Sequence, residues 1–156
     1  RGERLVRERG RMLRALVRST ATATRAAPLL QHARGAQHQI TRIGVDDPRM
    51  SRVVVHRGIV YTLGVTAADA GDDITTQTTA TLKKVDELLA SAGTDKSRAL
   101  TSMIWLRDIS RDFKAMNEVW NGWVDPENKP TRATVQAEMA RPSILVEIQV
   151  TAAVDE

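Results

Sequence analysis

An arginine and a glutamate near the C-terminus have the side-chain types and the setting for acid–base chemistry on a small carboxylic acid. Arg132 lies in the segment 129–135 and Glu147 in the segment 144–150, and both segments alternate apolar and polar residues as β-strands do. The apolar positions are Ala133, Val135 and Ala137 in the first segment and Ile144, Val146, Ile148 and Val150 in the second. If the two strands pair with these apolar faces matched, Arg132 and Glu147 project from the same side of one sheet.

These two side chains suit the hydrolysis of a carbon that is bonded to a carboxylate. A guanidinium such as that of Arg132 binds a carboxylate through two parallel hydrogen bonds, which fixes the position of the neighbouring carbon. A carboxylate such as that of Glu147 can accept a proton from water and orient its attack. The alternative is structural, because an arginine and a glutamate on neighbouring strands also form ordinary ion pairs.

Composition narrows the chemistry further. The 156 residues include no cysteine, which excludes a disulfide framework, a thiolate nucleophile and a Cys-ligated metal. His32, His38 and His56 do not have the spacing of metal ligands, so no metal site is predicted. With 42% hydrophobic residues the chain can build one core, but its longest apolar runs are far too short to span a membrane.

Charge is distributed unevenly along the chain. Residues 1–39 contain nine Arg and two Glu, for a net charge of +7, and the remaining residues contain 14 basic and 17 acidic residues, for a net charge of −3. A basic body would suggest a nucleic-acid partner, but here only the N-terminal extension is basic. The body also lacks a pair of histidines for acid–base cleavage of RNA, so we expect no nucleic-acid partner.

The basic extension, residues 1–39, has the composition of an organellar transit peptide. It is rich in Arg, Ala, Ser and Thr, and it contains no acidic residue after Glu8. Leu13, Leu16 and Val17 have helical spacing. This pattern predicts a location in the mitochondrial matrix, with a plastid or the cytoplasm as alternatives. A basic tail that binds anionic surfaces and a retained structural arm also remain open.

Residues 40–156 form the predicted domain, with the element order β-β-α-β-α-β-β. Two β-rich runs at 52–56 and 59–65 flank Arg57-Gly58, which indicates a hairpin. The other expected elements are a helix from Asp72 or Asp73 to Gly93, a strand over 100–106, a helix from Ser110 to Pro126, and the two strands described above. In the strand over 100–106 the expected core positions are Leu100, Ile104 and Leu106. In the helix from Ser110 to Pro126 they are Phe113, Met116, Trp120 and Val124.

Two helices can cover only one face of a sheet of four or five strands. The other face is expected to carry Met103, Trp105 and Leu145 among polar groups, which makes it too apolar to remain in water. A second subunit is the simplest cover, and the tryptophans are accordingly interpreted as core and interface packing.

Several motifs between residues 42 and 155 resemble the RidA/YjgF family of reactive-intermediate deaminases, most closely its YoaB-like branch of RutC type. The most specific motif is the Pro-x-Arg strand of residues 130–137 followed by the Val-Glu-Ile of residues 146–148. The other matching segments are Arg49–His56, Tyr61–Gly64, Ile104–Leu106, Phe113–Asn117 and Trp120–Val124.

The resemblance implies an α+β, chorismate-mutase-like fold, in which a mixed sheet has two helices packed on one face and the chains assemble as a homotrimer with three clefts between subunits. It also implies hydrolysis of imines and enamines, such as 2-aminoacrylate, to 2-keto acids and ammonia without a cofactor. Carried onto this sequence, Arg132 grips the substrate carboxylate, Glu147 orients water, and the backbone of Gly64 lines the cleft.

Two further substrate-binding positions depart from the archetypal family pattern. Leu63 stands where those members carry serine, and Thr134 stands where they carry cysteine. The carboxylate grip is retained while the rest of the pocket is altered. Three functions therefore compete: hydrolysis of a carboxylate-bearing imine, binding of a small keto acid or other carboxylate without turnover, and a scaffold role with a protein partner in an organellar assembly.

Overall fold

The computed structural model describes residues 39–155, so the predicted N-terminal extension lies, apart from Gln39, outside the described residues. The strands are β1 (Thr41–Ile43), β2 (Val53–His56), β3 (Ile59–Thr62), β4 (Ala99–Leu106), β5 (Thr131–Gln136) and β6 (Val146–Ala153). The α-helices are α1 (Ile74–Ser91) and α2 (Ile109–Trp123), and two short 3-10 helices cover Ala68–Ala70 and Lys96–Arg98. No helix in this part of the chain is long and apolar enough to cross a bilayer.

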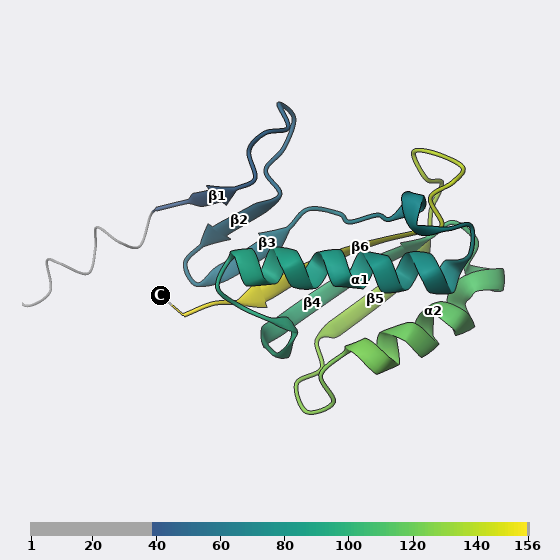
Figure 1. Ribbon diagram of the computed structural model, residues 1–156. Coiled ribbons are helices and arrows are strands. Elements are labelled where there is room, and N and C mark those ends of the chain that lie inside the picture. The colour runs from purple at the N-terminus through teal and green to yellow at the C-terminus, as the bar shows by residue number, and fades with distance from the viewer. Residues whose placement is uncertain (1–38, 156) are drawn as a thin grey trace, which may run out of the picture.

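The strands form one six-stranded sheet in the order β1-β2-β3-β6-β4-β5. β4 and β5 are parallel and are connected through α2, whereas the other neighbours are antiparallel. Both helices lie on the same face of the sheet (Figure 1). The predicted α+β architecture, a mixed sheet with two helices on one face, is therefore confirmed. The short edge strand β1 was not predicted.

A tight turn joins β2 to β3, as the sequence predicted. Arg57 and Gly58 at its centre have φ values of 50° and 68°. Two consecutive residues at positive φ are the mark of a type I′ turn, whose twist matches that of the flanking strands.

The helix ends follow capping rules, with one difference from the prediction. The Asp73 carboxylate accepts a hydrogen bond from the Thr76 N–H at 2.9 Å and begins α1, and Gly93, with a φ of 78°, follows its end. The second helix is capped by Asp108 rather than by Ser110. Asp108 follows β4 almost directly, so α2 begins as soon as the strand has ended.

The hydrophobic core lies between the helices and the sheet. Its largest fully buried side chains include Leu82, Leu89, Ile104, Leu106, Met116 and Ile148. Burial of a side chain of this size contributes about 1.5–3 kcal/mol. The alternation predicted for the last strand is confirmed on β6, where Val146, Ile148 and Val150 are buried.

Two residues expected in the core are exposed. Leu100 points outward because a β-bulge at the start of β4 resets the alternation of that strand. Phe113 is exposed because α2 buries another helical row, formed by Asp112, Met116 and Trp120. These three residues follow one another at intervals of four, which places them on one face of the helix.

β5 turns its apolar side away from the helices, which corrects the predicted strand pairing. Its register places Arg132 and Thr134 in line with buried residues of β4, and places Val135 in line with Trp105 on the face without helices, called here the open face. β4 also lies between β5 and β6, so these two strands do not pair. The predicted alternation of β5 is present, but its apolar side lies on the open face and not on the face that the helices cover.

Candidate functional site

Glu147 and Gly64 meet on the open face of the sheet. After β3 the chain rejoins β6 through two hydrogen bonds between Val65 and Ile148, of 2.8 and 3.0 Å, which bring Gly64 beside Glu147. A Cβ atom added at Gly64 would overlap Oε1 of Glu147 and would lie 2.9 Å from its Cδ. The carboxylate therefore rests against the Gly64 backbone, and any side chain at position 64 would displace it.

A cavity of about 280 Å³ opens beside the Glu147 carboxylate. It is lined by Trp105, Ala137, Glu138, Met139, Ala140 and Glu147. Trp105 is the cross-strand neighbour of Glu147 and gives the cavity an apolar side. Within the described residues Glu147 has no ion-pair partner, so its carboxylate is available to a ligand or to water.

Arg132 lies on the other face of the sheet, near the helices. Its guanidinium carbon is 5.1 Å from the ring centroid of Trp120, close enough for a cation–π interaction. In the described part of the chain no carboxylate pairs with it, and burial lowers the pKa of the Arg132 guanidinium. A half-buried arginine without a counter-ion favours an anionic ligand. The negative charge of the ligand would offset the free-energy cost of burying an unpaired guanidinium.

The other predicted binding positions divide between these two places. Thr134 lies two residues after Arg132 on the same face, and its buried Oγ1 has no hydrogen-bond partner in the described structure. Leu63 is half-buried and packs against the core, while its N–H donates to the Arg52 carbonyl at 3.0 Å. Leu63 therefore offers the site a side chain without a hydroxyl group.

The prediction that Arg132 and Glu147 project from the same side of the sheet is wrong for a single chain. Arg132 shares its face with buried residues of β4, whereas Glu147 is in register with Trp105 on the open face. The alternative prediction, a cross-strand ion pair, is wrong for the same reason. The two charged groups belong to two separate half-sites, Glu147 with Gly64 and Arg132 with Thr134.

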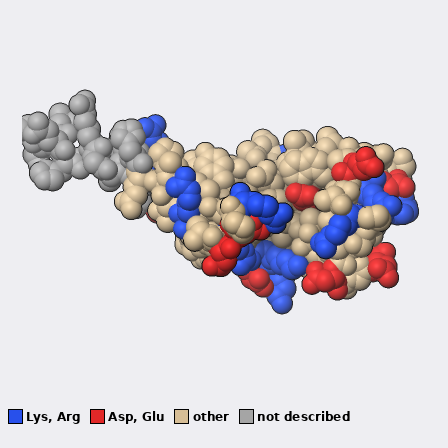
Figure 2. All heavy atoms as spheres, turned by 90° about the horizontal axis from the view of Figure 1, so that it is seen from above, with Lys and Arg blue, Asp and Glu red and all other residues tan. Residues whose placement is uncertain are grey.

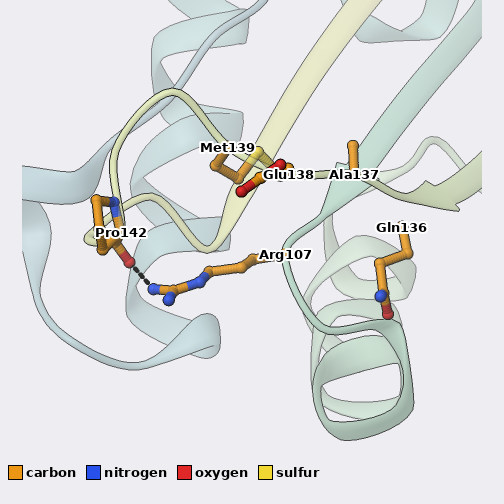
Figure 3. Close-up of a pocket in the computed structure, with 6 residues that line it drawn as sticks. All are labelled: Arg107, Gln136, Ala137, Glu138, Met139 and Pro142. Atoms are coloured by element: carbon orange, nitrogen blue, oxygen red, sulfur yellow. Dashed lines mark hydrogen bonds between the residues drawn. The ribbon is translucent and has the colours of Figure 1, made fainter.

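The loop between β5 and β6, residues 137–145, closes one end of the Glu147 cavity and is attached to β4 at both ends. The Ala137 N–H donates to the Leu106 carbonyl and the Arg107 N–H donates to the Leu145 carbonyl, each at 3.0 Å. The Arg107 guanidinium also donates to the Pro142 carbonyl (Figure 3). These bonds hold the loop over the ends of the two parallel strands.

A buried amide on α1 fixes the same loop from behind. Gln77 has no exposed surface, and its Nε2 donates to the carbonyls of Ser143 and Gly71 at 2.8 and 2.7 Å. Its Oε1 accepts from the Leu145 N–H at 3.0 Å. Every bond of a buried amide adds to the rigidity of the groups it joins, so the wall of the cavity is preformed.

Sequence reasoning missed three residues of this region. Trp120 was interpreted only as packing, yet it also lies against the Arg132 guanidinium. Arg107 and Glu138 were not singled out, although each follows a strand closely. Charged residues directly after β4 and β5 could have been found by that position, because the carboxyl ends of parallel strands are common ligand sites.

Charges on the domain surface are mixed in sign. In the face seen in Figure 2, basic and acidic side chains lie interspersed over the described part of the molecule. Among residues 39–155 no three His, Asp or Glu side chains gather in an arrangement that could hold a metal ion. The expectation that nucleic acid is not a partner stays a prediction.

Comparison with known proteins gives matches that span the domain. A family model described as Endoribonuclease L-PSP matches residues 46–154. A RutC family protein of Haemophilus ducreyi is 40% identical over 116 residues, which cover 74% of this chain and 97% of that protein. The RutC family protein YoaB of Escherichia coli is 39% identical, with 74% of this chain and 100% of that protein covered.

A more distant relative and a solved structure extend these matches. The 3-aminoacrylate deaminase RutC of Acinetobacter baylyi is 31% identical over 96 residues, which cover 58% of this chain and 75% of that protein. The crystal structure of a YjgF protein family member from Neisseria meningitidis matches with a TM-score of 0.73 and 36% identity, covering 77% of this chain and 98% of that one.

The predicted mitochondrial location is wrong. The relatives from Haemophilus and Escherichia coli are bacterial proteins without transit peptides, from cells that have no mitochondria. The prediction rested on composition and on the helical spacing of three apolar residues, and neither feature is specific to import signals.

Proposed function

Because this chain belongs to the YjgF/RidA family, described as Endoribonuclease L-PSP, we propose that it hydrolyses small carboxylate-bearing imines and enamines to 2-keto acids and ammonia. The observation that carries the proposal is the pair of half-sites. One offers Arg132, whose guanidinium has no counter-ion among residues 39–155, and the other offers a carboxylate beside a cavity, Glu147. The name of one relative, a 3-aminoacrylate deaminase, supports the reaction class.

The proposed reaction site is shared between two copies of the chain. One copy cannot present Arg132 and Glu147 to the same small substrate, because they project from opposite faces of its sheet. The open face also leaves Tyr61, Met103 and Val135 exposed by 46%, 36% and 40%, and a second copy would remove this apolar surface from water. Three copies related by rotation would close a ring with one repeated contact, which is the homotrimer we propose.

Within such a cleft each group has a defined part in the chemistry. Arg132 binds the substrate carboxylate, which places the adjacent C=N carbon near Glu147 of the neighbouring copy. Glu147 takes a proton from water as the water oxygen bonds to that carbon, and the nitrogen takes up a proton. The new hydroxyl group then gives its proton to Glu147 and the nitrogen takes up a second proton, so that the C=O bond forms as the C–N bond breaks. Ammonia leaves and the keto acid remains, with one water consumed for each ammonia. An enamine enters the same route after a proton is added to its carbon.

The direct test is ammonia release by the full chain from freshly generated 2-aminoacrylate and from 2-iminobutanoate. We expect a rate well above that in buffer, and a loss of that rate in Arg132→Ala. Arg49→Ala is the matched control, because Arg49 is exposed and its ion pair among residues 39–155 is with Asp47. A rate no higher than buffer with every imine, in a protein that is assembled, would overturn the proposal.

A second candidate is a carboxylate-binding protein of the same assembly that does not turn its ligand over. Two residues favour it: Leu63 brings no hydroxyl group, and the Thr134 hydroxyl has no hydrogen-bond partner in the described part of the chain. In that event 2-ketobutyrate should raise the melting temperature of the wild type and not of Arg132→Ala, while no imine is hydrolysed. Ligand stabilisation that survives in Arg132→Ala would exclude this candidate.

We do not propose RNA cleavage, although the family description contains the word endoribonuclease. His56 is the only histidine among residues 39–155, and its Nδ1 is buried. Acid–base cleavage of RNA by a pair of histidines would require a second histidine beside His56.

A further inference from the structure

A second cavity, of about 410 Å³, lies at the carboxyl ends of the two parallel strands (Figure 3) and shares Ala137, Glu138 and Met139 with the Glu147 cavity. Its lining consists of Arg107, Gln136, Ala137, Glu138, Met139 and Pro142. In open sheets, ligands bind at the carboxyl ends of parallel strands, beside the start of the connecting helix. That helix is α2, and the Gln136 side chain accepts a hydrogen bond from its first residue, Ile109, at 3.0 Å. The cavity thus occupies the position in the fold where a ligand is expected.

Opposite charges line this cavity without neutralising each other. Arg107 donates to the Pro142 carbonyl, and the other donors of its guanidinium have no partner among the described residues. Glu138 lines the same cavity, and no ion pair joins it to Arg107. Ala137, Met139 and Pro142 supply an apolar side. A ligand that carries both charges and a short apolar group would satisfy all three features.

The walls are fixed before any ligand arrives. The loop that carries Glu138 and Met139 is bonded to β4 at both ends, and buried Gln77 holds its last residues. A preformed site binds with a smaller loss of conformational entropy than one that must be ordered. Its volume also falls in the range of small-molecule pockets, about 300–1,000 Å³.

We propose that this cavity binds a free α-amino acid in its zwitterionic form. The carboxylate would bind the remaining donors of Arg107, and the ammonium group would bind the carboxylate of Glu138. The side chain would lie against Met139 and Pro142. Neither Arg132 nor Glu147 lines this cavity, although Glu138 and Met139 also line the neighbouring Glu147 cavity.

Calorimetric titration of the full chain with L-valine, N-acetyl-L-valine and L-valinamide tests this directly. The titrations are done with the Arg132→Ala variant, because this substitution removes the other arginine that is proposed to bind a carboxylate. L-Valine should bind, and each blocked derivative should bind about tenfold more weakly or worse, because each loses one charge-assisted contact. Equal binding of N-acetyl-L-valine would indicate an anion site and overturn the proposal, as would the absence of L-valine binding.

Substitutions then locate the ligand. Arg107→Gln and Glu138→Gln should each weaken L-valine binding about tenfold or more. Arg141→Gln is the matched control, since Arg141 lies in the same loop but does not line the cavity, and its binding should equal that of the parent. Circular dichroism checks that each variant is folded. If Arg107→Gln does not fold, the titrations with L-valine and its two blocked derivatives, together with Glu138→Gln, test the proposal. Undiminished binding in both cavity variants would overturn the proposal.

Discussion

The two faces of the sheet differ in how completely one chain satisfies them. On the helix-covered face Ile104 and Ile148 have no exposed surface, and the buried Thr62 hydroxyl both donates to the Val150 carbonyl and accepts from the Val150 N–H. On the open face Met103 is partly exposed, Glu147 has no ion-pair partner in the described structure, and no helix covers either. The helix-covered face is complete within one chain, whereas the open face has the composition of a surface that another chain completes.

Arg132 and Thr134 are exceptions on the helix-covered face, and Arg132 is the charged one. It lies on the edge strand β5, where the cover by α2 ends, and Trp120 contacts it in place of a carboxylate. An edge position leaves a side chain accessible to a neighbouring subunit. The difference between the two faces therefore predicts that each face contributes one half of the proposed site.

The largest difference should come from two neighbouring residues of β4. Ile104→Lys would place an unpaired charge in the core, a cost of several kcal/mol against a typical total stability of about 5–15 kcal/mol, and the chain should unfold. Trp105→Lys changes the open face, so the chain should remain folded while the assembly dissociates and activity is lost. Circular dichroism and sedimentation separate the two results. A Trp105→Lys protein that keeps three chains of 17.2 kDa together would contradict the assignment of the open face.

Mixing two inactive variants tests whether the half-sites come from different copies. Arg132→Ala and Glu147→Gln should each lose ammonia release, but subunits exchanged between them would form some clefts in which both residues are intact. Random mixing at equal amounts should restore about a quarter of the wild-type rate, since each contact joins two different surfaces. Mixtures that stay inactive, after mass measurement has verified subunit exchange, would show that Arg132 of one copy and Glu147 of another do not act together in one cleft.

Gly64→Ala should separate activity from stability. The added methyl group would displace the Glu147 carboxylate, and a shift of about 1 Å in a catalytic group can cost about 10²-fold in rate. The melting temperature should change little, because the displaced group is the end of a flexible side chain. Gly122→Ala is the control: its Cβ would meet nothing within 4 Å, and it should add about 1 kcal/mol of helix stability without altering the rate. Equal losses of activity in both variants would rule out the Glu147 explanation.

The smallest effect is expected where Trp120 contacts Arg132. Trp120→Phe keeps an aromatic ring but weakens the cation–π interaction, so KM should rise about two- to tenfold with little change in kcat. Trp123→Phe is the matched variant, because the ring of Trp123 lies under Lys96 instead and its N–H bonds to Asp86. An equal rise of KM in both variants would show that the tryptophans act only through general stability.

Local features of the fold were predictable, because each depends on a few neighbouring residues. The Arg57-Gly58 turn followed from its residue types, and the cap of α1 was narrowed to Asp72 or Asp73, of which the structure uses Asp73. The faces were harder, since alternation on β5 groups Val135 with Ala133 but cannot tell which side the helices cover. The order of the strands was beyond a local argument as well, because the α2 crossover places β4 between β5 and β6. The residues of the two candidate half-sites could be proposed from the sequence, but their placement on opposite faces of the sheet could not.

The place of β6 in the sheet has a consequence for synthesis of the protein. β6 is the last strand along the described chain, yet it lies in the interior of the sheet and pairs with both β3 and β4. While the ribosome has released the chain only as far as β5, the edges of β3 and β4 have no partner between them and can join other chains. Closure of the sheet must therefore follow translation of the final strand. Nascent chains stalled after Gln136 should be cut readily by protease, and full-length released chains should resist it.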